Sequence, residues 1–154
     1  MLATIGYEGV AQKDFVAALR SSGVEVLVDI RDRAQSRKPG FSKGALSSAI
    51  EDAGMEYVHI KALGDPKEGR DAARAGMFER FRLVFSAVLE SVDGRLALAE
   101  VEKLARSKKI CLMCYERDPN HCHRKIVSDR LEESLGCKTM HLGVPLNGAA
   151  RSMR

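Results

Sequence analysis

Six reactive side chains lie within eleven consecutive residues, in the stretch CYERDPNHCHR. They are two thiols, a carboxylate, an imidazole and two guanidinium groups, which can act as nucleophiles, acid–base groups, metal ligands and anion binders. No other part of the sequence concentrates reactive groups in this way. The six residues are Cys114, Glu116, Arg117, Cys122, His123 and Arg124. This stretch is therefore the strongest candidate for a functional site.

The elements on either side of this stretch place it at a strand-to-helix turn. The run ICLMCYE overlaps its start and is typical of a buried strand, and CHRKIVSDRLEESLG overlaps its end with apolar residues at helical spacing. In open α/β proteins, ligands bind where parallel strands end and helices begin. The sequence therefore predicts that the reactive groups face a cleft at that position.

The two cysteines at this turn have different surroundings. Cys122 is predicted in the first turn of a helix, where free N–H groups and the helix dipole favour a thiolate, and His123 adds to this effect. Cys114 ends an apolar strand and could equally be a buried core residue. We predict that Cys114 or Cys122 is a nucleophile, that Glu116 moves protons, and that His123 tunes the thiol. The alternative is that Cys122 packs under the turn and its neighbours only hold the loop.

A metal site is a second interpretation of the same residues. Thiolates and imidazole are ligands that zinc and other transition metals prefer, so Cys114, Cys122 and His123 could bind such an ion. Cys111 also forms a C-x2-C pair with Cys114. However, residues three apart on a strand point to opposite faces, so we predict that Cys111 belongs to the core instead. The sequence by itself requires no cofactor.

A basic segment lies near the end of another predicted strand. Residues 29–43 carry five basic and two acidic side chains, and Pro39-Gly40 sets a turn among them. Such a loop can bind an anion, although a solvated basic loop is the equal alternative. The predicted substrate-binding residues come from the ends of three strands and the adjoining helix. They are Tyr7, Glu8, Asp29, Arg31, Arg37, Arg117 and Arg124.

Strand and helix patterns alternate along the chain. Apolar, β-prone runs lie at residues 2–6, 24–30, 55–60, 109–115 and 137–142, and helical patterns lie at residues 11–21, 43–53, 75–92, 95–107 and 122–135. Gly94 separates two of the helical patterns, and Phe78, Phe81 and Phe85 are predicted to be core. Residues 61–74 are rich in Gly, Pro and charge and are predicted as a loop. This order predicts a three-layer α/β/α, Rossmann-like fold around a mainly parallel sheet of about five strands.

Length and composition limit the class of protein. The 154 residues suit one domain, with residues 145–154 predicted as a flexible tail. No apolar run approaches the roughly 18 residues that span a membrane, and the sequence shows no secretory signal. We therefore expect a cytoplasmic protein with no membrane partner and with reduced cysteines. The net charge of +4 suits an anionic partner and permits nucleic acid.

Four stretches together resemble the DUF488 family. In chain order they are TIGYEG, LVDIRDRAQSRKPGFSK, EYVHIKALGDP and ICLMCYERDPNHCHR, and the resemblance runs from about residue 3 to residue 136. It implies a compact α/β fold and a shared reactive cluster, but no particular reaction. The chain departs from the family pattern at Ala34, where we would expect a proline nearby, and at Asp65, where we would expect a glycine.

Three functions are consistent with the sequence. The first is an enzyme that hydrolyses, or transfers a group on, a small anionic substrate such as a phosphorylated or nucleotide-like molecule. The second is a nucleic-acid-binding module that uses the basic loop at residues 31–43. The third is a metal-binding protein that uses Cys114, Cys122 and His123.

Overall fold

Five parallel strands form one sheet in the computed structural model, which describes residues 1–144. The strands are β1 (Leu2–Gly6), β2 (Val26–Asp29), β3 (Glu56–His59), β4 (Ile110–Cys114) and β5 (Thr139–Leu142). Their order across the sheet is β3-β2-β4-β1-β5, and every neighbouring pair is parallel. The predicted tail at residues 145–154 lies outside the described residues.

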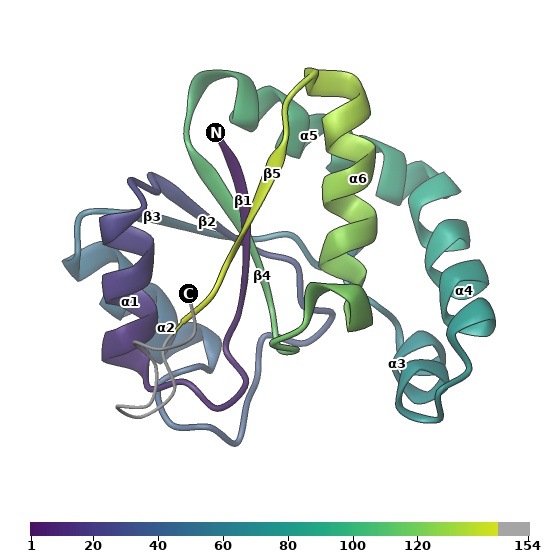
Figure 1. Ribbon diagram of the computed structural model, residues 1–154, viewed down its shortest axis with the longest axis horizontal. Helices are drawn as coiled ribbons and strands as arrows, with labels where there is room; N and C mark the ends of the chain where they lie inside the picture. Colours follow the sequence, from purple (N-terminus) through teal and green to yellow (C-terminus); the bar gives the residue numbers. More distant parts are fainter. Residues whose placement is uncertain (145–154) are drawn as a thin grey trace.

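Helices cover both faces of the sheet (Figure 1). Helices α1 (Gln12–Ser21) and α2 (Lys43–Asp52) pack on one face. The opposite face carries α3 (Lys67–Arg74), α4 (Phe78–Glu90), α5 (Val92–Ser107) and α6 (His123–Leu135). The predicted three-layer α/β/α fold with a parallel sheet is therefore confirmed. No helix in residues 1–144 is both long and apolar enough to cross a membrane.

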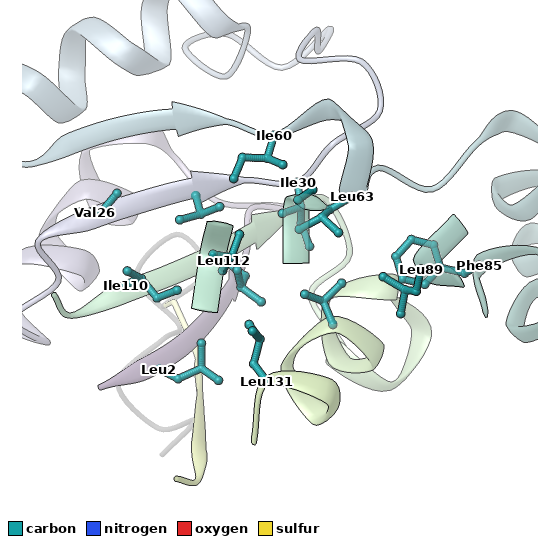
Figure 2. Close-up of a cluster of buried hydrophobic side chains, with 14 of the residues drawn as sticks. Leu2, Val26, Ile30, Ile60, Leu63, Phe85, Leu89, Ile110, Leu112 and Leu131 are labelled. Carbon is teal, nitrogen blue, oxygen red and sulfur yellow. The ribbon is translucent and has the colours of Figure 1, made fainter. Parts of the chain in front are cut away.

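Alternating side chains of the strands build two cores. Ile110 and Leu112 of β4 face the layer of α3 to α6, and Figure 2 shows them in a cluster with side chains such as Leu131 of α6. Cys111 and Met113 belong instead to the core beneath α1 and α2. This alternation follows from the strand period of two residues. Cys111 is fully buried, which confirms its predicted place in the core.

Two expectations about the elements were wrong. The predicted loop at residues 61–74 contains a 3-10 helix, η1 (Lys61–Leu63), and helix α3. Helix α3 buries only Gly69 and Ala72, so it lacks the apolar stripe that would reveal a helix in the sequence. Phe78 is 37% exposed, so it is not core like Phe81 and Phe85, and its ring stacks on the ring of His121.

Gly94 lies inside helix α5 and does not precede it. The Ser91 hydroxyl caps this helix by accepting a hydrogen bond from the Gly94 amide at 3.0 Å. A Cβ atom at Gly94 would collide with the Val88 carbonyl, so α4 and α5 join closely only because this position is glycine. Gly94, which we expected to separate two helices, therefore lies at a close contact in the first turn of α5.

Candidate active site

A cleft of about 650 Å³ opens at the carboxyl edge of the sheet. Its walls come from the segments that follow β1, β2 and β4, from the start of α6, and from α3 with the residues before it. The lining residues are Tyr7, Arg31, Asp32, Arg33, Gln35, Arg37, Asp65, Arg70, Arg74, Cys114, Tyr115, Glu116 and His123. This is the edge at which the sequence predicted a site.

The turn from β4 to α6 is held from inside by Arg124. This side chain is fully buried and donates hydrogen bonds to the Thr4 hydroxyl at 3.1 Å, the Arg117 carbonyl at 3.1 Å and the Glu116 carbonyl. Gly6 lies against the same turn, because a Cβ there would collide with the Glu116 carbonyl. Arg124 therefore shapes the wall that carries Cys114 and Glu116. We expected Arg124 to bind an anion in the cleft, but its side chain does not line the cleft.

Local capping sets the position of Cys122. Asp118 accepts a hydrogen bond from the Asn120 amide at 2.9 Å and starts a short 3-10 helix, η2 (Pro119–His121). Cys122 is then the N-cap of α6, and its sulfur lies 3.5 Å from the Arg124 amide nitrogen. The sulfur is therefore beside the free N–H groups at the start of the helix, as the sequence predicted.

The Cys114 and Cys122 sulfurs form a disulfide, so our expectation of reduced cysteines is wrong for these two, whereas Cys111 and Cys137 are free thiols. Both residues of the disulfide are buried, with Cys114 on the cleft wall and Cys122 behind it. The two sulfurs and a ring nitrogen of His123 all lie within 4.8 Å of one another. If the disulfide is reduced, these three residues could hold a metal ion between them.

His123 is buried beside the sulfur pair. Its Nε2 donates a hydrogen bond to the Ile30 carbonyl at 2.7 Å, and the edge of its ring meets the ring of Phe85. Nδ1 lies 3.6 Å from the Cys122 sulfur. Burial lowers the pKa of His123 to about 4, so the ring is neutral near pH 7 and its Nδ1 is an acceptor.

Two carboxyl groups with raised pKa values face the cleft. Burial raises the pKa of Glu116, whose Oε2 lies 3.6 Å from the Cys114 sulfur. Burial also raises the pKa of Asp65 to about 7, although the positive charge of Arg70 opposes this shift. Within the described residues, Oδ1 of Asp65 has no hydrogen-bond partner. With a pKa of about 7, Asp65 can hold its proton near neutral pH and act as a general acid.

Arginines from two elements line the same cleft as these carboxyl groups. Arg33 and Arg37 of the loop after β2 are exposed, and within residues 1–144 no hydrogen bond or ion pair holds either side chain. Arg70 and Arg74 approach from α3, where Arg70 pairs with Asp32 at 3.1 Å. The α3 arginines and Asp65 were not among the predicted site residues, because this region was predicted as a loop. The spacing of four between Arg70 and Arg74 was the one pattern that could have placed them on a shared helix face.

Comparison with protein families gives one match. The model of the family described as "Domain of unknown function DUF488" matches residues 11–131, which is most of the chain and includes the whole stretch from Cys114 to Arg124. The chain belongs to the DUF488 family. Neither the curated proteins nor the solved structures that were searched contain a match. Membership of DUF488 therefore confirms the resemblance that the sequence showed and assigns no reaction.

Other predicted residues of this DUF488 chain have internal partners. Arg31 lines the cleft, but its guanidinium group donates hydrogen bonds to Asp29 at 2.7 Å and to the Phe41 carbonyl at 2.7 Å. Asp29 is fully buried and also accepts a hydrogen bond from the Tyr57 hydroxyl. Tyr7 lines the cleft, stacked on Phe41. Arg31 and Asp29 therefore fix the base of the basic loop, where we had expected substrate contacts.

Glu8 and Arg117 lie beside the cleft of the DUF488 chain and do not line it. The Glu8 carboxylate accepts a hydrogen bond from the Arg117 amide at 3.0 Å, which ties the end of β1 to the β4–α6 turn. The Arg117 side chain donates to the Val144 carbonyl at 2.7 Å. Both residues therefore support the turn that carries Glu116.

Proposed function

We propose that this DUF488 protein is an enzyme that hydrolyses, or transfers a group on, a small anionic substrate bound in the cleft. The proposal is supported by two kinds of side chain that line the same cleft, namely arginines that can bind an anion and a cysteine and a glutamate that can react with it. Arg33 and Arg37, whose side chains have no partner within residues 1–144, line the same cleft as Cys114 and Glu116. A phosphorylated or nucleotide-like substrate suits guanidinium groups, which bind phosphate through two parallel hydrogen bonds.

The facing wall supplies groups for proton transfer and attack. Burial raises the pKa of Glu116, which favours its protonated form, and its place on the cleft wall makes it the group that we assign to proton transfer. Cys114 is the cysteine of the pair that lines the cleft, and as a free thiolate it would be the nucleophile that the sequence predicts. Asp65 is a second acid on the α3 side of the cleft.

Binding of inorganic phosphate and of a nucleoside monophosphate, measured by titration calorimetry, tests the anion site. We expect Arg37→Gln to weaken phosphate binding about tenfold, which corresponds to about 1.4 kcal/mol. Arg82→Gln is the matched control, because Arg82 is an exposed arginine of α4 outside the cleft. Equal affinity in wild type and Arg37→Gln would contradict the proposal.

An oligonucleotide that binds far more tightly than the mononucleotide, with steep salt dependence, would indicate a nucleic-acid-binding module instead.

Turnover of a panel of phosphate esters tests the chemistry. For any ester that wild type converts, we expect Glu116→Gln to lower kcat by about 10²-fold or more while phosphate binding changes little. Unchanged turnover in Glu116→Gln would show that this carboxyl group is not the acid.

A further inference from the structure

The most concentrated set of metal-ligand atoms in the described chain lies at one corner of the cleft. The sulfurs of Cys114 and Cys122 and a ring nitrogen of His123 lie within 4.8 Å of one another, and all three residues are buried. They come from two elements, because Cys114 ends β4 while Cys122 and His123 begin α6. We propose that, in the reduced protein, these three residues bind one divalent transition-metal ion, for which zinc is the best match.

The hydrogen bond of His123 prepares it as a ligand. A carbonyl only accepts hydrogen bonds, so the contact of 2.7 Å between Nε2 and the Ile30 carbonyl places the proton of the neutral ring on Nε2. Nδ1 then carries the lone pair, and this is the atom that lies 3.6 Å from the Cys122 sulfur. Histidines that bind metals commonly donate their other N–H to a carbonyl in this way, which fixes the ring.

Arg124 gives the two sulfurs partners that suit thiolates. Its Nη1 lies 3.6 Å from the Cys114 sulfur, and its amide nitrogen lies 3.5 Å from the Cys122 sulfur. Both groups are donors, so they stabilise negative charge on the sulfurs. Two thiolates and one divalent cation together are neutral, which lowers the cost of placing them in a buried site.

The main chain leaves room for the two sulfurs to separate around an ion. The α-carbons of Cys114 and Cys122 are 7.4 Å apart, compared with about 4.4–6.8 Å in most disulfides. A tetrahedral zinc ion places two sulfur ligands roughly 3.8 Å apart, because each Zn–S bond is about 2.3 Å. Rotation of the two side chains after reduction can provide this separation.

Reduction of the disulfide comes before metal binding. A dithiol reductant gives two electrons and two protons to the disulfide, which yields the Cys114 and Cys122 thiols and the oxidised reductant. The ion then displaces the two thiol protons and binds Nδ1 of His123. Cys114 and His123 line the cleft, so water or substrate in the cleft could supply a fourth ligand to the ion. Metal binding does not require the arginines of the anion site, so the two sites can fail separately. A Cys114 thiolate that holds the ion is not free to act as the nucleophile, so the two roles of Cys114 exclude each other.

Cobalt titration of the full chain tests the site. Wild-type protein reduced with a phosphine should bind one Co²⁺ per chain with sulfur-to-cobalt charge-transfer absorption, and Zn²⁺ should displace it. His123→Gln and Cys122→Ser should bind at least tenfold more weakly. Cys137→Ser is the matched control, because Cys137 is a free cysteine outside the cluster, and it should bind like wild type. Absence of the sulfur-to-cobalt bands in reduced wild type would overturn the proposal.

Alkylation of the phosphine-reduced wild-type protein tests the same site without a variant that could misfold. Zn²⁺ should slow iodoacetamide labelling of Cys114 and Cys122 at least tenfold, as read by peptide mass mapping, and should leave Cys137 unaffected. Equal labelling rates of Cys114 and Cys122 with and without Zn²⁺ would overturn the proposal.

Discussion

At the scale of single residues, Asp65 makes stability depend on pH. Burial raises its pKa in the folded protein to about 7, from an ordinary value of 3.8. The folded state therefore holds this proton more tightly than the unfolded state, so the contribution of Asp65 to stability falls as the pH rises from about 4 to 7. Asp65→Asn removes the ionising group, and we expect this variant to be more stable than wild type at pH 8 by about 1–2 kcal/mol. The gain is limited to this range because Arg70 and solvent in the cleft reduce the cost of ionising Asp65 in the folded protein.

Urea unfolding at pH 4, 6 and 8 measures this effect. The stability difference between Asp65→Asn and wild type should grow between pH 4 and pH 7 and then level off. Asp71→Asn is a control of opposite sign, because the hydrogen bond from exposed Lys67 lowers the pKa of Asp71. Because the pKa of folded Asp71 lies below 3.8, the stability of Asp71→Asn relative to wild type should be nearly constant between pH 6 and pH 8 and should rise slightly as the pH falls to 4. A stability difference for Asp65→Asn that stays constant with pH would show that Asp65 is ionised normally.

The sequence alone was enough to distinguish the roles of some site residues but not of others. Cys111 and Cys114 were distinguished because the strand period alone decides which face a side chain takes. Arg31 and Arg37 looked alike, because the sequence does not show that Arg31 meets Asp29 and the Phe41 carbonyl in the folded protein. The disulfide was not expected, since spacing along the chain does not show that Cys114 and Cys122 meet across the turn.

At the scale of elements, β1 ends at a glycine because the β4–α6 turn lies against it. A Cβ at Gly6 would collide with the Glu116 carbonyl and lie 2.7 Å from Nη1 of Arg124. Gly6→Ala must therefore push the turn outward, and we expect a loss of about 1–3 kcal/mol of unfolding free energy. Turnover of any ester that wild type converts should fall as well, because the same turn carries Cys114 and Glu116.

Gly44→Ala is the matched control for this substitution. Gly44 lies in the first turn of α2, and no neighbouring atom lies within 4 Å of the place where an added methyl group would sit. Alanine should therefore stabilise the helix by about 0.5–1 kcal/mol. Urea unfolding of both variants measures the contrast. A Gly6→Ala protein as stable as Gly44→Ala would show that the contact between β1 and the turn is not tight.

Elements were predictable where burial leaves an apolar pattern. All five strands were found, because each lies in a sheet that helices cover on both faces. Helix α3 was missed because it lies at the rim and buries only two small residues. The same exposure that hides α3 in the sequence brings Arg70 and Arg74 to the cleft. Elements that carry polar groups to a site are thus the hardest to recognise from hydrophobic periodicity.

At the scale of the whole molecule, the order of the strands in the sheet could not be predicted from the sequence. The parallel class followed from the alternation of strands and helices, but β4 inserts between β1 and β2. This insertion depends on contacts between segments about a hundred residues apart, and similar apolar strands do not specify their neighbours. It places the end of β4 beside the ends of both β1 and β2. The position of β4 therefore explains why the reactive turn and the basic loop share one cleft.

The two cores on opposite faces of the sheet should unfold together as one domain. Phe15 of α1 and Phe85 of α4 are each fully buried, in different cores that share strand β4. We expect Phe15→Leu and Phe85→Leu each to cost about 1–2 kcal/mol, and to do so in a single urea transition. Tyrosine fluorescence reports mainly the face of α1 and α2, because Tyr7 and Tyr57 pack there, whereas far-UV circular dichroism is dominated by the larger layer of α3 to α6. Coincident midpoints by both probes in both variants support one cooperative unit, since strands shared by two cores couple their stability. Separate midpoints in Phe85→Leu would show instead that the layer carrying α3 unfolds independently of the rest.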